Sequence, residues 1–100
     1  MYAEKFLRDH PEIMEILKAV KYAIIRDIPL KESKLVGIAR YMNSKYIKKG
    51  THLKKAVRET AGILIRKGDK YTLTNLGREL LSTVSIKGYE FVPLKLRYKN

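Results

Sequence analysis

The chain has no cysteine and no tryptophan, and it has only two histidines. Without cysteine, neither a disulfide framework nor a thiolate metal site can form. His10 and His52 are far apart among scattered carboxylates, so we expect no zinc site or other metal. The longest apolar runs are about four residues, far too short to span a bilayer, and the N-terminus has no signal-peptide pattern. These absences predict a soluble cytoplasmic protein with no membrane partner.

Catalytic motifs are also missing. The sequence contains no nucleophile elbow, no phosphate-binding glycine loop and no His-Glu metal motif. Its ten acidic residues include no close aligned pair for general acid–base chemistry. We therefore expect a protein that is not an enzyme and needs no cofactor. The absence of Cys, Gln and Trp beside abundant Lys, Ile and Tyr is compatible with a thermophilic source.

Positive charge is what the chain has in excess, with 22 Lys and Arg against 10 acids and a net charge of +12. Residues 1–30 carry five bases and five acids, whereas residues 31–70 carry twelve bases and three acids, a net +9. Residues 71–100 add five bases and two acids, a net +3. A field of one sign concentrated in the middle of a chain favours a polyanionic partner over a merely solubilising surface.

Helical periodicity recurs in four segments without an intervening linker or internal repeat, which predicts one domain. Helices are expected over 11–27, 31–42, 51–61 and 74–84, with residues 2–8 as a short preceding helical turn. Asp9, Thr51 and Thr74 are the expected N-caps, and Gly62 is expected to end the third helix. The predicted buried face of the first long helix consists of Ile13, Ile16, Leu17, Val20, Ala23 and Ile24.

A β-hairpin is predicted between the last two helices. The apolar run 63–65 and the alternating run 71–74 flank Gly68-Asp69, which supplies turn chemistry, and cations lie at the tip. Just before this hairpin, the helix over 51–61 carries an inner stripe of Leu53, Ala56, Val57 and Thr60. A basic helix followed by a basic hairpin suits the groove and the flanking phosphates of a duplex. Near the C-terminus, residues 92–98 alternate as in a half-buried strand.

The order of helices and hairpin resembles the winged helix-turn-helix family of archaeal and bacterial transcription regulators. The resemblance covers about residues 11–84 and is sharpest in AGILIRKGDKYTLTNLGRELL. It implies an α+β, mainly α fold: a winged helix-turn-helix with a two-stranded wing and a C-terminal helix. The single domain would span 1–100, with residues 85–100 as an extension. The recognition helix would be 51–61, the supporting helix 31–42 and the wing 66–70.

The candidate contacts to double-stranded DNA are the cations of the turn, helix and wing, together with one threonine. They are Lys45, Lys48, Lys49, Thr51, Lys54, Lys55, Arg58, Arg66, Lys67 and Lys70. Arg58 is the best candidate for a bidentate contact with guanine in the major groove. The turn lysines suit backbone phosphate near a helix N-terminus, and the wing cations suit the minor groove or phosphate.

Four neighbouring residues are expected to have structural roles. Tyr46 is expected to pack beneath the turn, and His52 to pack or to cap. Glu59 is expected to pair with Lys55 one helical turn earlier. Asp69 is expected to shape the tip of the hairpin.

Two rival functions fit the same residues. The turn over 43–50 is longer than in most such regulators, and YIKKGTHLKKAV is similar to the linker-histone globular domain, which favours an architectural DNA-binding protein of the nucleoid. A winged domain that docks an acidic protein is the other rival. A homodimer is also predicted, because Met14, Tyr22 and Ile25 lie off the main apolar stripe and the strand over 88–98 lacks an obvious partner.

Overall fold

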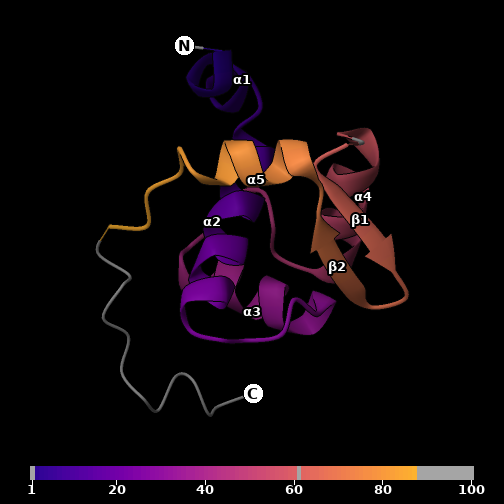
Figure 1. The fold of residues 1–100 in the computed structure, drawn as a ribbon. Helices are drawn as coiled ribbons and strands as arrows, with labels where there is room; N and C mark the ends of the chain where they lie inside the picture. Colours follow the sequence, from indigo (N-terminus) through magenta and orange to yellow (C-terminus); the bar gives the residue numbers. More distant parts are fainter. Residues whose placement is uncertain (1, 61, 88–100) are drawn as a thin grey trace.

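The computed structural model describes residues 2–60 and 62–87, which form a mainly helical α+β fold (Figure 1). Within those ranges there are five helices and one two-stranded antiparallel sheet. The elements in chain order are α1 (Tyr2–Asp9), α2 (Pro11–Ile25), α3 (Glu32–Tyr41), α4 (Gly50–Glu59), β1 (Leu64–Lys67), β2 (Lys70–Leu73) and α5 (Asn75–Leu81). The predicted α+β, mainly helical class is confirmed, and the arrangement is compatible with a winged-helix layout.

Helix α2 is the central element and contacts α1, α3, α4 and α5. Because neighbours surround it, it is buried on several sides rather than along one stripe. Tyr22 is only 2% exposed, and its ring centroid lies 6.1 Å from that of Tyr41 in α3. Ile24 was predicted to be in the core, but it is 49% exposed. That prediction was wrong because α3 covers the side of α2 that carries Tyr22. In the C-terminal half of α2, the residues that face α3 are the buried ones.

The helices begin and end close to the predicted positions, but two of the three predicted N-caps are wrong. Asp9 is the last residue of α1, and His10 precedes α2 without a side-chain capping bond. Thr51 lies inside α4, which begins at Gly50 after the N-cap Lys49. The third N-cap, Thr74, is confirmed, since its Oγ1 accepts a hydrogen bond of 3.1 Å from the backbone N–H of Gly77.

Helices α2 and α3 end in the same motif, in which a residue other than glycine adopts a left-handed backbone. Asp27 and Asn43 each have a φ of 58°. At the end of α3, the N–H of Asn43 donates to the carbonyl of Arg40 at 3.0 Å, and the N–H of Ser44 donates to that of Ala39 at 2.9 Å. These two bonds make a Schellman motif, which stops each helix and turns the chain sharply.

The predicted hairpin is confirmed. Its register runs from Leu64 opposite Leu73 to Lys67 opposite Lys70, and Gly68 in the two-residue loop has a φ of 64°. Residues 30–32 attach the hairpin to the start of α3. The N–H of Tyr71 donates to the carbonyl of Leu30 at 2.8 Å, and the N–H of Glu32 donates to that of Asp69 at 2.7 Å. The wing is therefore fixed to the helical body along one strand.

Two of the three apolar residues behind the predicted dimer are used within the monomer. Tyr22 is in the core, and Met14 packs partly buried against it. Ile25 is 50% exposed, and its neighbour Ile24 is 49% exposed. The predicted strand over 88–98 lies outside the described residues. Of the three apolar residues behind the predicted dimer, Ile25 is the one that is largely exposed, and it lies at the C-terminal end of α2.

Candidate nucleic-acid interface

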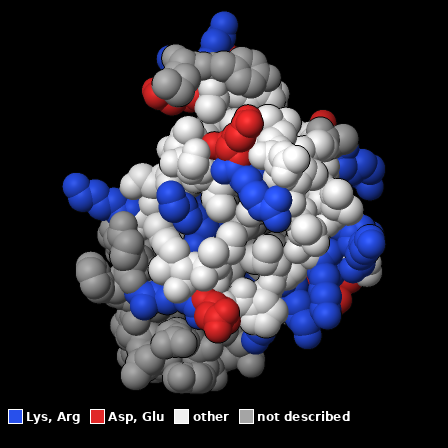
Figure 2. All heavy atoms as spheres, viewed as in Figure 1, with Lys and Arg blue, Asp and Glu red and all other residues white. Residues whose placement is uncertain are grey.

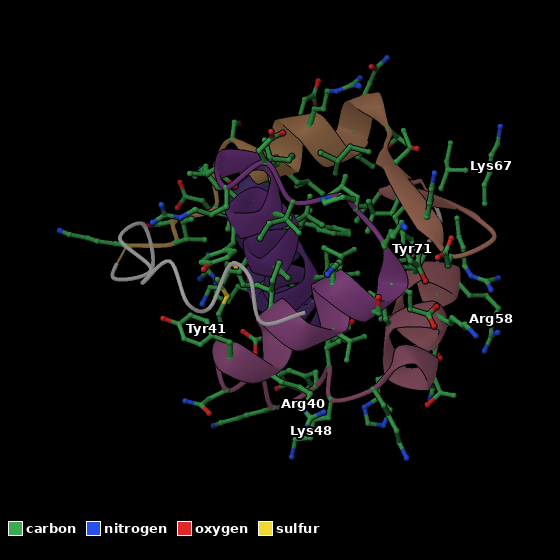
Figure 3. The ribbon with its side chains drawn as sticks, turned by 90° about the horizontal axis from the view of Figure 1, so that it is seen from below. Arg40, Tyr41, Lys48, Arg58, Lys67 and Tyr71 are labelled. Atoms are coloured by element: carbon green, nitrogen blue, oxygen red, sulfur yellow. The ribbon has the colours of Figure 1, made fainter. Side chains whose placement is uncertain are left out.

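Helix α4 divides its side chains between the core and solvent as predicted. Leu53, Ala56 and Val57 are buried. Thr51, Lys55 and Arg58 are exposed on the opposite side. Figure 3 shows Arg58 pointing away from the body on the same side as Lys67 of the wing. The two elements that carry most of the predicted contacts therefore direct cations to the same side of the molecule.

The start of α4 is electrostatically unfavourable for the protein alone. The N-cap Lys49 makes no side-chain capping bond, and the first turn contains no acidic residue. Instead, Lys48 and Lys49 lie exposed at the end of the helix whose free N–H groups carry partial positive charge. Nδ1 of His52 accepts from the N–H of Lys48 at 3.2 Å, but Lys48 precedes the N-cap, so this bond leaves the N–H groups of the first helical turn without a cap. Most helices place Ser, Thr, Asp or Asn here, whereas the anion beside this N-terminus is the carboxylate of Glu32 from α3, which lies over Gly50.

The turn between α3 and α4 is built around Ser44. This side chain is buried, and its Oγ accepts from the backbone N–H groups of Tyr46 at 3.2 Å and Ile47 at 3.0 Å. The resulting turn directs Ile47 into the core, where it is 2% exposed, and leaves Tyr46 45% exposed. The predicted packing of Tyr46 beneath the turn is wrong, because Ile47 occupies that position. Lys45 and Lys48 remain exposed on this turn.

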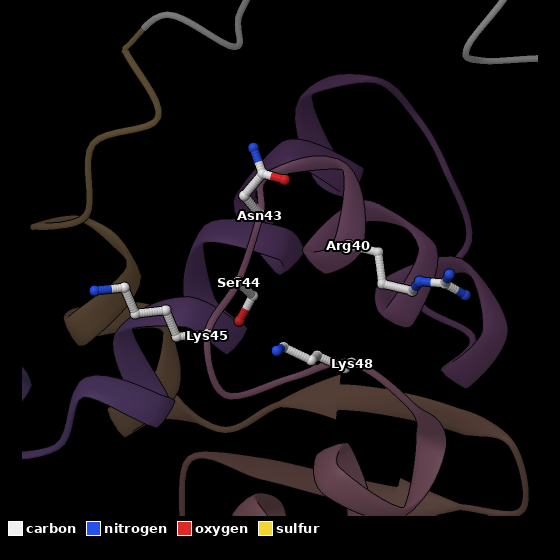
Figure 4. A pocket seen from close by; sticks show the side chains of 5 residues that line it. All are labelled: Arg40, Asn43, Ser44, Lys45 and Lys48. Atoms are coloured by element: carbon white, nitrogen blue, oxygen red, sulfur yellow. The ribbon is translucent and has the colours of Figure 1, made fainter.

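A hollow of about 500 Å³ lies beside the turn (Figure 4), lined by Arg40, Asn43, Ser44, Lys45 and Lys48. Arg40 is an exposed cation of α3 that the sequence reasoning missed. Its signal was present: it lies in the predicted helix 31–42, on the side opposite the buried Leu35 and Ile38. Arg40 also lines a second hollow of about 400 Å³ between α3 and the start of α4, so it extends the cationic surface onto α3.

The wing carries its cations close together. Arg66, Lys67 and Lys70 are exposed, and Lys67 lies directly opposite Lys70 in the antiparallel register. Like charges directly opposite each other destabilise a hairpin. In Figure 2, Lys and Arg side chains gather along the margin where Figure 1 places the wing and α4. Here, too, the protein alone holds a charge arrangement that an anion would relieve.

Glu32 connects the wing, α3 and α4. Tyr71 of β2 donates a hydrogen bond from its hydroxyl to Oε1 of Glu32 at 3.2 Å. Nζ of Lys54 lies 3.8 Å from the other oxygen, Oε2. Burial, followed by the negative charge of Glu32 and the hydrogen bond to it, raises the pKa of Tyr71 to about 12 against a smaller opposing effect of Arg66. The phenol therefore stays protonated and keeps donating to Glu32 at neutral pH.

This arrangement changes the expected ion pairs of α4. Lys55 and Glu59 were predicted to pair, but among the described residues α4 forms its ion pair through Lys54 with Glu32. The pairing differs because α3 packs against α4 and brings Glu32 to the Lys54 side. Lys54 is thus partly neutralised, while Lys55 stays unpaired within the described part of the chain.

The described residues contain no group of three or more His, Asp or Glu side chains arranged to hold a metal ion. None of their helices is both long and apolar enough to cross a membrane. Comparison with protein-family models, curated proteins and solved structures found no match to this chain. The resemblance to winged helix-turn-helix regulators therefore rests on the motif and on the arrangement of elements alone.

Proposed function

We propose that this protein binds double-stranded DNA as a winged helix-turn-helix, with α4 in the major groove and the wing on the flanking backbone. The observation that carries the proposal is the start of α4. An uncapped helix N-terminus is flanked by Lys48 and Lys49 and is followed by an exposed face of Lys55 and Arg58. Each of these features is unfavourable alone and favourable beside phosphate.

The arrangement of elements supports the finer fold assignment. The order α2, paired segment 30–32, α3, α4, hairpin and α5 brings a supporting helix, a recognition helix and a wing together in the expected sequence. In this assignment Arg58 and Lys55 read base edges. Lys45, Lys48, Lys49 and the wing cations hold phosphate. A transcription regulator of the nucleoid is the function that this division of labour fits best.

Binding of a labelled mixed-sequence duplex, followed by fluorescence anisotropy at about 50 mM salt, tests the proposal where electrostatic attraction is strongest. Neutralising Lys48 and Lys49 to Gln should weaken binding and reduce the salt slope by roughly one unit for each phosphate contact. Lys5→Gln and Lys87→Gln are matched controls, because both lysines are exposed and lie away from α4 and the wing. Absence of binding by the wild-type protein would refute the proposal.

An architectural protein remains the second candidate, favoured by the exposed cations that extend from α4 to Arg40 and the turn. Such a surface contacts phosphate over a wide area and need not read bases. Selection of binding sites from random duplex, followed by sequencing, separates the two. An enriched motif supports a regulator, and the absence of enrichment supports an architectural protein.

A further inference from the structure

Glu32 is the one acidic side chain lining the hollow between α3 and the start of α4, within the part of the chain that the structure describes. The charged side chains around it in that hollow are Arg40, Lys48 and Lys49. Its carboxylate lies close over α4: a Cβ added to Gly50, the first residue of that helix, would be 2.5 Å from Oε2. The carboxylate thus occupies a place where the helix and its lysines favour an anion.

The two partners of Glu32 hold it with different strength. Tyr71 is buried, and its hydroxyl bonds directly to Oε1. Lys54 is held at 3.8 Å only, and its side chain is 40% exposed. Exposed ion pairs of this kind contribute little to stability, because water screens both charges. Lys54 can therefore leave Glu32 while the bond to Tyr71, and with it the position of the wing, is kept.

Resting on the proposed function, we propose that Glu32 is an internal competitor for backbone phosphate. In the free protein its carboxylate neutralises Lys54 beside the start of α4. When a duplex docks there, a phosphate takes Lys54 from Glu32. Glu32 thereby weakens binding to every duplex equally, which limits non-specific binding and leaves base contacts to decide where the protein stays.

Glu32→Gln tests this directly, because the amide oxygen still accepts from Tyr71 while the negative charge is lost. We expect the variant to bind a mixed-sequence duplex about three to five times more tightly than wild type. The salt slope should stay nearly unchanged, because Lys54 contacts a phosphate in both proteins and the same number of counterions is released. Glu79→Gln is the matched control, because it removes the same charge from an exposed residue of α5, which carries none of the proposed duplex contacts. It should change the affinity less than about twofold.

The decisive experiment repeats Glu32→Gln in a protein that already carries Lys54→Gln. If Glu32 acts by holding Lys54, the gain from Glu32→Gln disappears in the double variant. A gain that persists without Lys54, or equal effects of Glu32→Gln and Glu79→Gln, would overturn the inference. If circular dichroism shows that Glu32→Gln does not fold, two lysine variants test the inference instead. Lys54→Gln must then weaken duplex binding less than Lys55→Gln does. Equal losses of affinity overturn the inference.

The same titrations separate this inference from the proposed function. If wild type binds duplex, and Glu32→Gln and Glu79→Gln bind it with equal affinity, only the role of Glu32 fails. If neither wild type nor Glu32→Gln binds at about 50 mM salt, where attraction is strongest, both proposals fail.

Discussion

Gly77 lies buried in the first turn of α5, where this helix crosses the end of the loop into β1. A Cβ at this position would collide with the backbone carbonyl of Ile63 and lie 2.9 Å from Cδ2 of Leu73. We expect Gly77→Ala to lower the free energy of unfolding by about 1–3 kcal/mol, as overpacking does. Gly68→Ala is the control, because its new Cβ would contact no other atom. Only the left-handed backbone at this position should then lower the free energy of unfolding, by about 1 kcal/mol. Urea denaturation compares the two, and equal losses would contradict the collision.

Tyr71 gives the protein a specific weakness in alkali. Its pKa is raised to about 12 in the folded state, from 10.0, so the folded protein retains a proton that the unfolded chain releases first. The stabilisation is complete below pH 10 and is lost as the pH rises through 12, and it amounts to roughly 2 kcal/mol. Thermal melts between pH 9 and 12 should show wild type losing this stability relative to Tyr71→Phe. Parallel losses in both proteins would show that Tyr71 contributes nothing to the pH dependence.

At the scale of elements, the end of α2 offers a simple stabilising change. Asp27 holds the left-handed position of a Schellman motif with a φ of 58° and is exposed. Glycine adopts this backbone without steric cost. We expect Asp27→Gly to raise the free energy of unfolding by up to about 1 kcal/mol, and Asp27→Ala to lower it. Chemical denaturation of both variants checks the sign, and stabilisation by alanine would exclude the backbone explanation.

For the whole molecule, the proposed function predicts that the positive surface divides its work. Arg58→Ala should narrow the gap between a preferred site and random duplex, with a loss of about 1–3 kcal/mol on the preferred site. Lys67→Ala should weaken every duplex alike and reduce the salt slope by roughly one unit. Titrations of both variants against both duplexes at several salt concentrations measure this. The same uniform weakening in both variants would favour the architectural protein.

The predicted homodimer also belongs to this scale. Ile24 and Ile25 expose about half of their surface at the end of α2. A two-fold dimer through this end would match a palindromic site with half-sites about one helical turn apart. Light scattering at micromolar concentration should give a dimer mass, and Ile25→Lys should give a monomer. A monomeric wild-type mass would rule the dimer out.

Local chemistry in the sequence determined most of the elements. Gly68-Asp69 between an apolar run and an alternating run specified the hairpin, and Thr74 specified the start of α5. The inner stripe of α4 was also correct, because an amphipathic period needs no knowledge of the neighbouring elements. The concentration of cations in residues 31–70 predicted which part of the chain would form the basic surface.

Tertiary structure decided what depends on neighbours distant in sequence. Tyr22 is buried and Ile24 exposed because α3 packs on one side of α2, and no periodicity within α2 specifies that side. Ile47 rather than Tyr46 enters the core because the Ser44 hydroxyl fixes the turn. Lys54 pairs with Glu32, 22 positions earlier, because two helices and a strand meet there. Periodicity and capping act over a few residues, whereas packing and ion pairing depend on which surfaces the fold brings together.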